Sequence, residues 1–479
     1  MTELHRNYIG GEWVAGPSAS PNRNPSNVDD VIGDYSQADA TQAKAAIAAA
    51  KAAAPAWAAG SIQDRSILLD RVGTEILARK DDLGRLLSRE EGKTLPEGVG
   101  EATRAGHIFK FYAGEVLRLA GEKLPSVRPG IDVEVTREPI GVVGLITPWN
   151  FPIAIPAWKI APALAYGNTV VFKPADLVPG CAWALSEILA KAGIPKGVFN
   201  LVMGRGSVVG EALVNDPDVA GISFTGSVST GRAIAGKAVG RMAKMQLEMG
   251  GKNPLIVLDD ADLPTAVNCA VQGAYFSTGQ RCTASSRLIV AAGIHDRFVA
   301  AMTEKLKALK VDDALAAGTD IGPVVDPSQL EQDQRYIEIG KGEGAALAWG
   351  GERLKRGSDG YYLSPALFTN ATNAMRIARE EIFGPVACVI RAKDYDEALA
   401  FANDTEFGLC AGIVTTSLKH ASHFKRNAQA GMVMVNLPTA GVDYHVPFGG
   451  RKASSYGPRE QGRYAAEFFT SVKTAYIAP

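Results

Sequence analysis

From Val142 onward, short runs of β-branched and apolar residues alternate with stretches long enough to form a helix. The first series of runs is GVVGLIT, NTVVFKP, GVFNLVMG, VAGISFTG and NPLIVLDD. A second series, between Arg287 and Val435, is SSRLIVAAG, GPVACVIRA, GLCAGIVTTS and GMVMVNLP. Strands that alternate with helices at this spacing form a doubly wound parallel sheet, because parallel neighbours need a crossover connection. The pattern therefore predicts an α/β fold with two doubly wound units.

The first third of the chain has helical rather than strand periodicity. We predict helices over residues 41–59, 64–87 and 97–119. Residues 124–141 and the tail FFTSVKTAYI instead alternate polar and apolar positions, which is typical of strands. Two isolated strands are marginal alone, so we expect these segments to pair with each other or with another subunit.

Composition excludes several classes of partner. Fifty Lys and Arg against fifty-one Asp and Glu give a formal charge of −1, which offers no attraction to nucleic acid or an anionic membrane. The apolar stretch 141–158 is interrupted by Pro148, Pro152 and Pro156, so we interpret it as a buried strand followed by a loop. The first residues, MTELHRNYIGGEW, lack the basic start and apolar run of a signal peptide.

The five cysteines are widely spaced and form no C-x-x-C pair. This spacing favours neither a metal site nor a disulfide framework, and we expect reduced thiols and a cytoplasmic protein without a metal.

Three motifs indicate ligand binding at strand ends. In ITPWNFP, residues 146–152, the Asn150 amide suits a developing oxyanion, or else it satisfies loop carbonyls. In FKPAD, residues 172–176, a lysine and an aspartate can bind a ribose or phosphate, or else pair with each other. In FTGSVSTG, residues 224–231, the helix start offers free N–H groups to a pyrophosphate, or is an ordinary capped helix. The glycines at 204, 206 and 210 depart from the dinucleotide fingerprint.

Three further motifs carry reactive side chains. In LEMGG, residues 247–251, apolar neighbours would raise the pKa of Glu248 toward that of a general base, unless it forms a structural salt bridge. In TGQRC, residues 278–282, Arg281 and a helix start would lower the pKa of Cys282, unless this is an inert core cysteine. EEIFGP, residues 380–385, places a carboxylate and an aromatic ring before a strand and says little alone.

Taken together in this order, the six motifs resemble the aldehyde dehydrogenase superfamily, and the resemblance runs from the Gly-Gly-Glu-Trp opening to the C-terminal strand. It implies that Cys282 is the nucleophile, Glu248 the base that activates water and Asn150 the oxyanion donor. It further implies that the chain oxidises an aldehyde to a carboxylate with NAD, NADP being a second possibility. The residues expected to bind the cofactor are Ile146, Thr147, Trp149, Lys173, Asp176, Gly206, Gly210, Phe224, Gly226, Ser227, Gly250, Glu381 and Phe383.

The resemblance also implies a domain scheme. Residues 1–123 and 142–250 would form a Rossmann-like cofactor-binding domain, and residues 251–450 a catalytic domain. Residues 124–141 and 460–479 would form a small β oligomerisation element, and we expect a homodimer or homotetramer.

Residues 436–462 resemble, more specifically, the α-ketoglutaric semialdehyde (2,5-dioxopentanoate) dehydrogenases. This resemblance predicts an aldehyde with a distal carboxylate, with succinate and glutarate semialdehydes as alternatives. Arg281 or Lys159 could supply the cation that binds the carboxylate, and Gln280 or Thr439 could orient the substrate. Each of these side chains could instead be structural.

Other classes of protein remain as alternatives. A cysteine hydrolase would need a histidine base, and the six histidines show no such motif. A CoA-acylating dehydrogenase would need no water-activating carboxylate, so Glu248 speaks against it. A binding protein on a retired dehydrogenase fold is a further possibility, although Cys282, Glu248 and Asn150 are all present.

Overall fold

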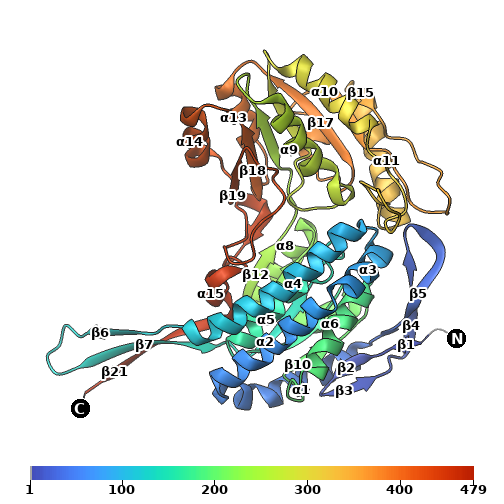
Figure 1. The fold of residues 1–479 in the computed structure, drawn as a ribbon. Helices are drawn as coiled ribbons and strands as arrows, with labels where there is room; N and C mark the ends of the chain where they lie inside the picture. The colour runs from blue at the N-terminus through green and yellow to red at the C-terminus, as the bar shows by residue number, and fades with distance from the viewer. Residues whose placement is uncertain (1–2, 479) are drawn as a thin grey trace.

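The computed structural model describes residues 3–478 and shows two α/β lobes with a slender projection (Figure 1). Each lobe is built on one large sheet, with eight strands in one and seven in the other, and two three-stranded sheets complete the fold. The predicted α/β class with two doubly wound sheets is confirmed. Within residues 3–478 no helix combines the length and the apolar character needed to cross a bilayer.

The first large sheet has the strand order β20-β12-β11-β8-β9-β10-β2-β3. Its five central strands, β12, β11, β8, β9 and β10, are parallel. β20 at one end and β2 at the other pair antiparallel with them, and the edge strand β3 pairs antiparallel with β2. Their bounds are β2 Asn7–Ile9, β3 Glu12–Val14, β8 Val142–Ile146, β9 Thr169–Lys173, β10 Phe199–Leu201, β11 Val219–Thr225, β12 Lys244–Glu248 and β20 Ser455–Tyr456.

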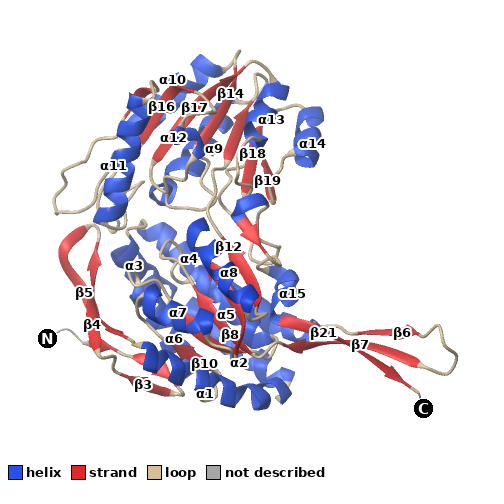
Figure 2. Cartoon of the chain, turned by 180° about the vertical axis from the view of Figure 1, so that it is seen from behind, coloured by secondary structure: helices blue, strands red, loops and turns tan. Residues whose placement is uncertain are grey.

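Helices cover both faces of this sheet (Figures 1 and 2). They are α1 Ala40–Ala59, α2 Ile62–Ala78, α3 Lys80–Glu91, α4 Leu95–Glu115, α5 Ala154–Ala165, α6 Pro179–Lys191, α7 Glu211–Asn215 and α8 Val228–Gly240, with short turns η1 Val116–Arg118 and η2 Gly206–Gly210. The capping box of Thr94 and Glu97 fixes where α4 begins. The three predicted N-terminal helices are present, but the segment 64–87 is divided into α2 and α3 at Arg79.

Two local predictions are incomplete. The first third is mostly helical, as predicted, but residues before α1 also form β1 Leu4–His5, β4 Ser18–Asn24 and β5 Asn27–Gln37 besides β2 and β3. β4 and β5 form a hairpin with β1 beside β5, and β2 and β3 form a second hairpin that joins the first sheet where β2 pairs with β10. Segments such as SASPNRN in β4 contain few of the β-branched and aromatic residues that indicate a strand, so the sequence pattern did not reveal them. The loop predicted after β8 extends only to Ile153, and the rest of the segment belongs to the buried helix α5, which begins at Ala154. Pro156 fits its first turn because N–H groups there have no intrahelical partner.

The second large sheet has the order β15-β16-β17-β14-β13-β18-β19, and only β15 is antiparallel to its neighbour. The strands are β13 Pro254–Val257, β14 Arg287–Ala291, β15 Ala346–Trp349, β16 Ala366–Ala371, β17 Val386–Ala392, β18 Cys410–Val414 and β19 Met432–Val435. The helices of this lobe are α9 Leu263–Tyr275, α10 His295–Lys307, α11 Pro327–Gly342, α12 Arg376–Arg379, α13 Tyr395–Asn403 and α14 Leu418–Asn427, with the turn η3 Phe276–Gly279.

The projection consists of β6 Glu122–Pro125, β7 Asp132–Pro139 and β21 Thr470–Ile477 (Figures 1 and 2). β7 and β21 pair antiparallel over their whole length, from Thr470 opposite Pro139 to Ile477 opposite Asp132. This is one of the two pairings that the sequence left open. Between β19 and β21 the chain forms η4 Lys452–Ser454, η5 Gly462–Ala465 and α15 Ala466–Phe469. The predicted domain boundaries stay a prediction, and β20 shows that a segment beyond residue 450 returns to the first sheet.

Candidate active site

The predicted site residues gather where the two lobes face each other. Strands β12, β11, β8 and β9 are neighbours, and their last residues lie in register: Glu248 opposite Thr225, Phe224 opposite Ile146, and Ile146 opposite Lys173. Ligands of doubly wound sheets bind at such carboxyl ends. The second sheet contributes the loops that precede its strands, with Gly250 before β13, Cys282 before β14, and Glu381 and Phe383 before β17.

Two cavities meet at the thiol of Cys282. One of about 300 Å³ is lined by Phe151, Trp158, Phe448 and side chains of α4. The other, of about 220 Å³, is lined by Trp149, Asn150, Gly226, Ser227, Met249, Gly250, Glu381 and Phe383. Cys282 lines both cavities. The motifs for the cofactor and for the chemistry thus converge on one half-buried sulfur.

The loop before Cys282 has a constrained backbone. Ser277, Thr278 and Gly279 have φ angles of 50°, 56° and 67°, in the left-handed region that ordinary residues rarely adopt. A Cβ atom on Gly279 would lie 2.2 Å from the carbonyl oxygen of Gly384. The glycine of the TGQRC motif is therefore required for close backbone approach rather than for the reactivity of the thiol.

Asn253 fixes the position of this loop from the other side. Its Nδ2 donates to the carbonyl oxygens of Cys282 at 2.7 Å and Ala284 at 2.9 Å. Its Oδ1 accepts from the backbone nitrogen of Cys410 at 2.9 Å. Asn253 thereby ties the loop of residues 277–284, which carries Cys282 and is called the nucleophile loop below, to the strand β18. No motif in the sequence indicated this role.

The pKa of Cys282 differs from the expectation. Burial raises the pKa of the thiol to about 12, and the carboxylates of Glu381 and Glu248 raise it further. The predicted lowering by a helix start and Arg281 is wrong, because no helix begins at Cys282 and the guanidinium is paired with Glu97 at 3.0 Å. The structure therefore presents a protonated thiol at neutral pH.

Asn150 lies in the loop between β8 and α5 and is buried. Its Nδ2 donates to the carbonyl oxygen of Gln280 at 3.0 Å, so the amide is aimed at the nucleophile loop. The Trp149 ring meets the Phe383 ring edge-on with centroids 5.3 Å apart. An amide donor in this rigid, largely dry setting suits a developing negative charge on oxygen.

Glu248 is buried at the end of β12 and accepts a hydrogen bond from Ser455 Oγ. Burial raises the pKa of its carboxyl well above the usual range, and Glu460 nearby raises it further. The predicted upward direction agrees with this environment. Glu460 in turn binds the ammonium of Lys159, which also donates to Ser223 Oγ at 2.8 Å.

The second cavity fits the dinucleotide predicted from the sequence. Ser227 caps α8, so the first N–H groups of that helix are directed toward the cavity. The hydroxyls of Thr147 and Thr225 are buried and, within residues 3–478, have no hydrogen-bond partner. A Cβ atom on Gly206 or Gly210 would meet nothing within 4 Å, so packing does not demand glycine there and space is left open.

Lys173 and Asp176 form an ion pair of 2.9 Å. This pairing is the structural alternative that the FKPAD motif left open. Both side chains nevertheless lie at the carboxyl end of β9. Glu381 accepts a hydrogen bond from Gly251 N at 2.8 Å, and burial raises its pKa to about 7. The assignment of these residues to cofactor binding stays a prediction.

The tentative substrate residues are placed differently from the expectation. Lys159 is fully buried with Glu460 and does not line the cavity, so it cannot offer its charge to a substrate there. Gln280 Oε1 accepts from Val325 N at 3.0 Å, and Thr439 Oγ1 donates to the carbonyl oxygen of Thr283 at 2.7 Å. Both of these side chains are buried and support the nucleophile loop. Arg281 lines the cavity but is bound by Glu97 and Ser277.

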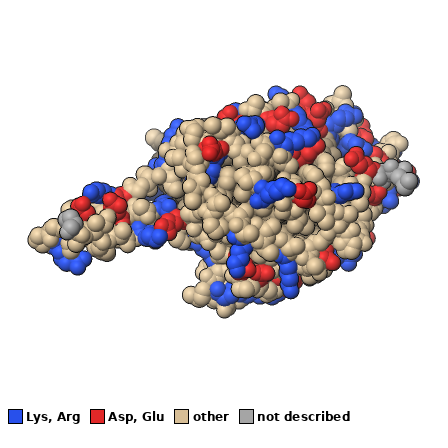
Figure 3. All heavy atoms as spheres, turned by 90° about the horizontal axis from the view of Figure 1, so that it is seen from below, with Lys and Arg blue, Asp and Glu red and all other residues tan. Residues whose placement is uncertain are grey.

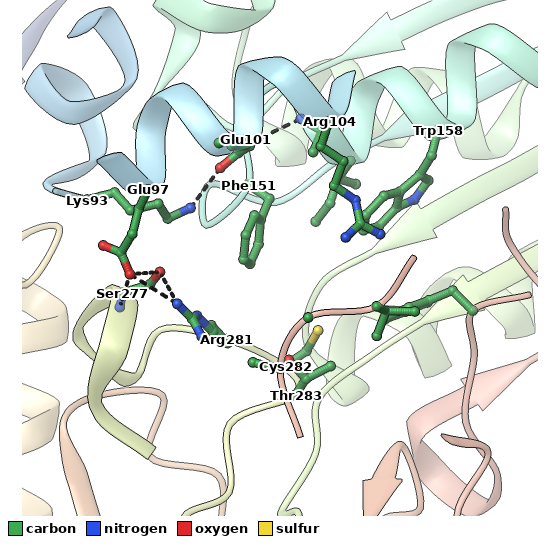
Figure 4. A pocket seen from close by; sticks show the side chains of 17 residues that line it. Lys93, Glu97, Glu101, Arg104, Phe151, Trp158, Ser277, Arg281, Cys282 and Thr283 are labelled. Carbon is green, nitrogen blue, oxygen red and sulfur yellow. Dashed lines mark hydrogen bonds and ion pairs between the residues drawn. The ribbon is translucent and has the colours of Figure 1, made fainter. Parts of the chain in front are cut away.

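The cavity also contains charged side chains that sequence reasoning missed. Lys93, Glu97, Glu101 and Arg104 all come from α4 or the turn before it (Figure 4). They occur in GKTLPEGVGEATRAG, whose helical spacing places Glu97, Glu101 and Arg104 on one face. This helical spacing predicts that the three side chains share a face, but it does not show that the face points to the nucleophile.

Comparison with known proteins agrees with this geometry. The family model described as "Aldehyde dehydrogenase family" matches residues 13–475. The alpha-ketoglutaric semialdehyde dehydrogenase of Bacillus subtilis (strain 168) is 44% identical over 477 residues, covering 99% of this chain and 98% of that protein. The 2,5-dioxopentanoate dehydrogenase of Saccharolobus solfataricus is 41% identical, with 98% of each chain covered.

A solved structure gives the same result. The crystal structure of betaine aldehyde dehydrogenase from Staphylococcus aureus in complex with NAD⁺ superposes with a TM-score of 0.97 at 34% identity, covering 99% of this chain and 95% of that chain. Sequence and structure therefore agree over nearly the full length, and the chain belongs to the aldehyde dehydrogenase family.

Proposed function

We propose that this chain oxidises 2,5-dioxopentanoate to 2-oxoglutarate with NAD. As an aldehyde dehydrogenase family member it is an NAD(P)-dependent oxidoreductase. The observation that carries the proposal is the thiol of Cys282, which lines both cavities and can meet an aldehyde from one and a nicotinamide from the other. The names of the B. subtilis and S. solfataricus relatives support the choice of substrate.

The first stage forms a bond between the Cys282 sulfur and the aldehyde carbon. The thiol first gives its proton to solvent water. As the sulfur then bonds to the carbon, the π electron pair of the carbonyl moves to oxygen, where the Asn150 amide supplies a hydrogen bond. The aromatic walls of Phe151 and Trp158 exclude water from this step. NAD, when bound, would accept the aldehyde hydrogen as hydride, and re-formation of the C=O bond would leave a thioester on the Cys282 sulfur.

The second stage releases the acid. Glu248 accepts a proton from water as the water oxygen attacks the thioester carbon, and the Cys282 sulfur leaves as thiolate. The raised pKa of Glu248 suits its role as general base, because a carboxylate is a stronger base when the pKa of its acid form is higher. Ser455 Oγ donates a hydrogen bond to Glu248, which favours the carboxylate form that acts as the base.

Self-association and a cytoplasmic location complete the proposal. The projecting sheet exposes Leu124, Val472 and Tyr476 far from either core, as an interface between subunits would. We propose a homodimer or homotetramer built on this sheet. A reducing compartment would keep the proposed nucleophile as a free thiol.

The test is a panel of aldehydes assayed with NAD by absorbance of the reduced cofactor. The expected order of kcat/KM is 2,5-dioxopentanoate first, then glutarate and succinate semialdehydes, then hexanal and benzaldehyde. Cys282→Ala is the control, and it should lose activity on every aldehyde while the protein keeps its fold. A higher kcat/KM for hexanal than for every semialdehyde acid would contradict the proposed substrate, and an active Cys282→Ala enzyme would contradict the mechanism.

A further inference from the structure

We propose that Arg104 is the residue that binds the distal carboxylate of the substrate. The inference rests on the proposed function for the identity of the substrate. It replaces the sequence-based candidates Arg281 and Lys159 with a residue that no motif indicated. The argument comes from the charges of the cavity that Cys282 shares with α4.

Five charged side chains line this cavity: Lys93, Glu97, Glu101, Arg104 and Arg281 (Figure 4). The two carboxylates are fully engaged. Glu97 accepts from Arg281 Nη2 at 3.0 Å and from the backbone of Ser277 at 2.8 Å. Glu101 accepts from the backbone nitrogens of Ile153 and Ala154, both at 3.1 Å, and from Lys93 at 2.8 Å.

Two of the three cations are engaged as well. Lys93 is paired with Glu101, donates to the carbonyl oxygen of Asn150 at 2.6 Å and lies 3.7 Å from the centre of the Phe151 ring. Arg281 is paired with Glu97 and donates to Ser277 Oγ at 2.8 Å. Moving either cation to a ligand would break a buried ion pair, which is strongly unfavourable.

Arg104 is the exception. Its Nε is buried without a hydrogen-bond partner, and no carboxylate of residues 3–478 lies within ion-pair distance of its guanidinium. Among the described residues, the guanidinium donates a single hydrogen bond, from Nη2 to Gln461 Oε1 at 3.1 Å. The guanidinium carbon lies 5.7 Å from the centre of the Trp158 ring, which holds the side chain against the cavity wall.

The surroundings of Arg104 favour an anion. Burial lowers the pKa of its guanidinium, with Glu101 and Asp443 acting in the opposite direction. A substrate carboxylate would supply the missing charge and can accept two parallel N–H bonds from an arginine. Figure 4 shows the side chain extending from α4 toward Trp158, on the same cavity wall that faces Cys282.

Space for the substrate is available beside Arg104. Gly100 lies one helical turn earlier on the same face of α4 and also lines the cavity. A Cβ atom placed there would meet nothing within 4 Å, so the position is open and not filled by packing. A short acid can therefore lie along α4 with its aldehyde at Cys282 and its carboxylate at Arg104.

The experiment compares Arg104→Met, Arg104→Lys and Arg281→Met with the unaltered enzyme. The matched control is Arg85→Met, which removes an exposed arginine of α3 outside the cavity. Each enzyme is assayed with 2,5-dioxopentanoate and with hexanal. Each is also assayed for inhibition of hexanal oxidation by pentanoate, which carries a carboxylate but no aldehyde. Thermal unfolding checks that each variant is folded.

Arg104→Met should lower kcat/KM for 2,5-dioxopentanoate roughly 10- to 100-fold, chiefly through KM, the loss expected for charge-assisted hydrogen bonds. Its kcat/KM for hexanal should change little, and its pentanoate inhibition constant should rise by a similar factor. Arg104→Lys should retain part of the kcat/KM for 2,5-dioxopentanoate and part of the inhibition by pentanoate that Arg104→Met loses. Arg281→Met should lower kcat/KM for both aldehydes by a similar factor, because it disturbs the nucleophile loop.

The outcomes separate the two proposals. If the unaltered enzyme prefers hexanal but pentanoate inhibition still depends on Arg104, the proposed substrate fails and the carboxylate site stands. If the enzyme prefers 2,5-dioxopentanoate and Arg104→Met retains both that preference and pentanoate inhibition, the Arg104 inference is overturned. A selective loss in Arg281→Met instead would assign the site to Arg281.

Discussion

Charge placement around single residues decides how the nucleophile is activated. Cys282 has its pKa raised by burial and by two carboxylates, Glu381 and Glu248, while the cation beside it in sequence is bound to Glu97. A thiol in this setting is protected from adventitious oxidation, since the thiolate is the reactive form. The pKa of the Cys282 thiol must therefore fall when a ligand binds and changes the charges around the sulfur.

Glu381→Gln should make the free thiol more reactive, because it removes a negative charge that opposes the thiolate. The pKa of Glu381 is about 7, so its charge is present mainly above that pH. The rate of Cys282 alkylation by iodoacetamide should rise several-fold over the unaltered enzyme at pH 8.5 and differ little at pH 6.

The matched control is Glu380→Gln, since Glu380 is paired with Arg376 at 2.8 Å and does not line either cavity. It should leave the alkylation rate unchanged at both pH values. Slower alkylation of Glu381→Gln at pH 8.5 would show that Glu381 does not raise the thiol pKa.

At the scale of elements, the site depends on which ends of the strands face each other. The first sheet presents carboxyl ends with Lys173, Ile146 and Thr225, and the second presents the loops before its strands. Loops at these ends can change sequence without disturbing the hydrogen-bonded strands behind them. We expect the end of β9 to set the choice of cofactor through Lys173 and Asp176.

Asp176→Asn should increase the use of NADP relative to NAD. The aspartate can bind a ribose diol and repels a 2′-phosphate, whereas Lys173 without its 2.9 Å partner is free to attract one. We expect the ratio of kcat/KM for NADP to that for NAD to rise roughly 10-fold, about 1.4 kcal/mol of differential binding.

Asp218→Asn provides the comparison, because Asp218 forms a similar surface ion pair with Lys51 at 2.6 Å, remote from the cofactor cavity. That variant should not change the cofactor ratio. An unchanged ratio in Asp176→Asn would show that Asp176 does not face the ribose.

At the scale of the whole molecule, the projecting sheet is the part without a core of its own. Three strands extend from the lobe, and most side chains of β21 are exposed (Figure 2). The body shows positive and negative side chains interspersed over the face seen in Figure 3. An apolar surface on a thin sheet is stabilised when a second subunit covers it.

A double substitution of Val472→Asp with Tyr476→Asp should therefore shift the protein toward a monomer of 50.5 kDa. Both side chains are strongly exposed, at 58% and 63%, and lie on the same face of β21 because they are an even number of residues apart. Light scattering at several concentrations measures the mass.

Met242→Asp is the control, since Met242 is 90% exposed on the body of the molecule and its positive φ suits aspartate. It should keep the mass of the unaltered protein. A monomer in the unaltered protein, or an unchanged assembly in the double variant, would contradict the proposed interface.

The sequence by itself determined the α/β class, the family and the order of the reactive motifs. These follow from local information: strand and helix periodicity is written in neighbouring residues, and motif spacing along six segments is specific enough to identify a family. Even the raised pKa of Glu248 followed from its neighbours Leu247 and Met249. The same local reasoning missed β1 to β5, because segments such as SASPNRN in β4 carry few of the β-branched and aromatic residues that indicate a strand. Only β2 among them also depends on a remote partner, β10.

Only the tertiary structure decided which charges are free. Arg281 and Lys159 were plausible partners for a carboxylate in the sequence, but Glu97 and Glu460, remote in the chain, already bind them. The helical spacing of Arg104 predicts the face of α4 on which it lies, but it lines the cavity only because α4 packs beside the nucleophile loop. The physical reason is that an ion pair depends on distances and burial, which are set when separate elements pack together and not by spacing along the chain.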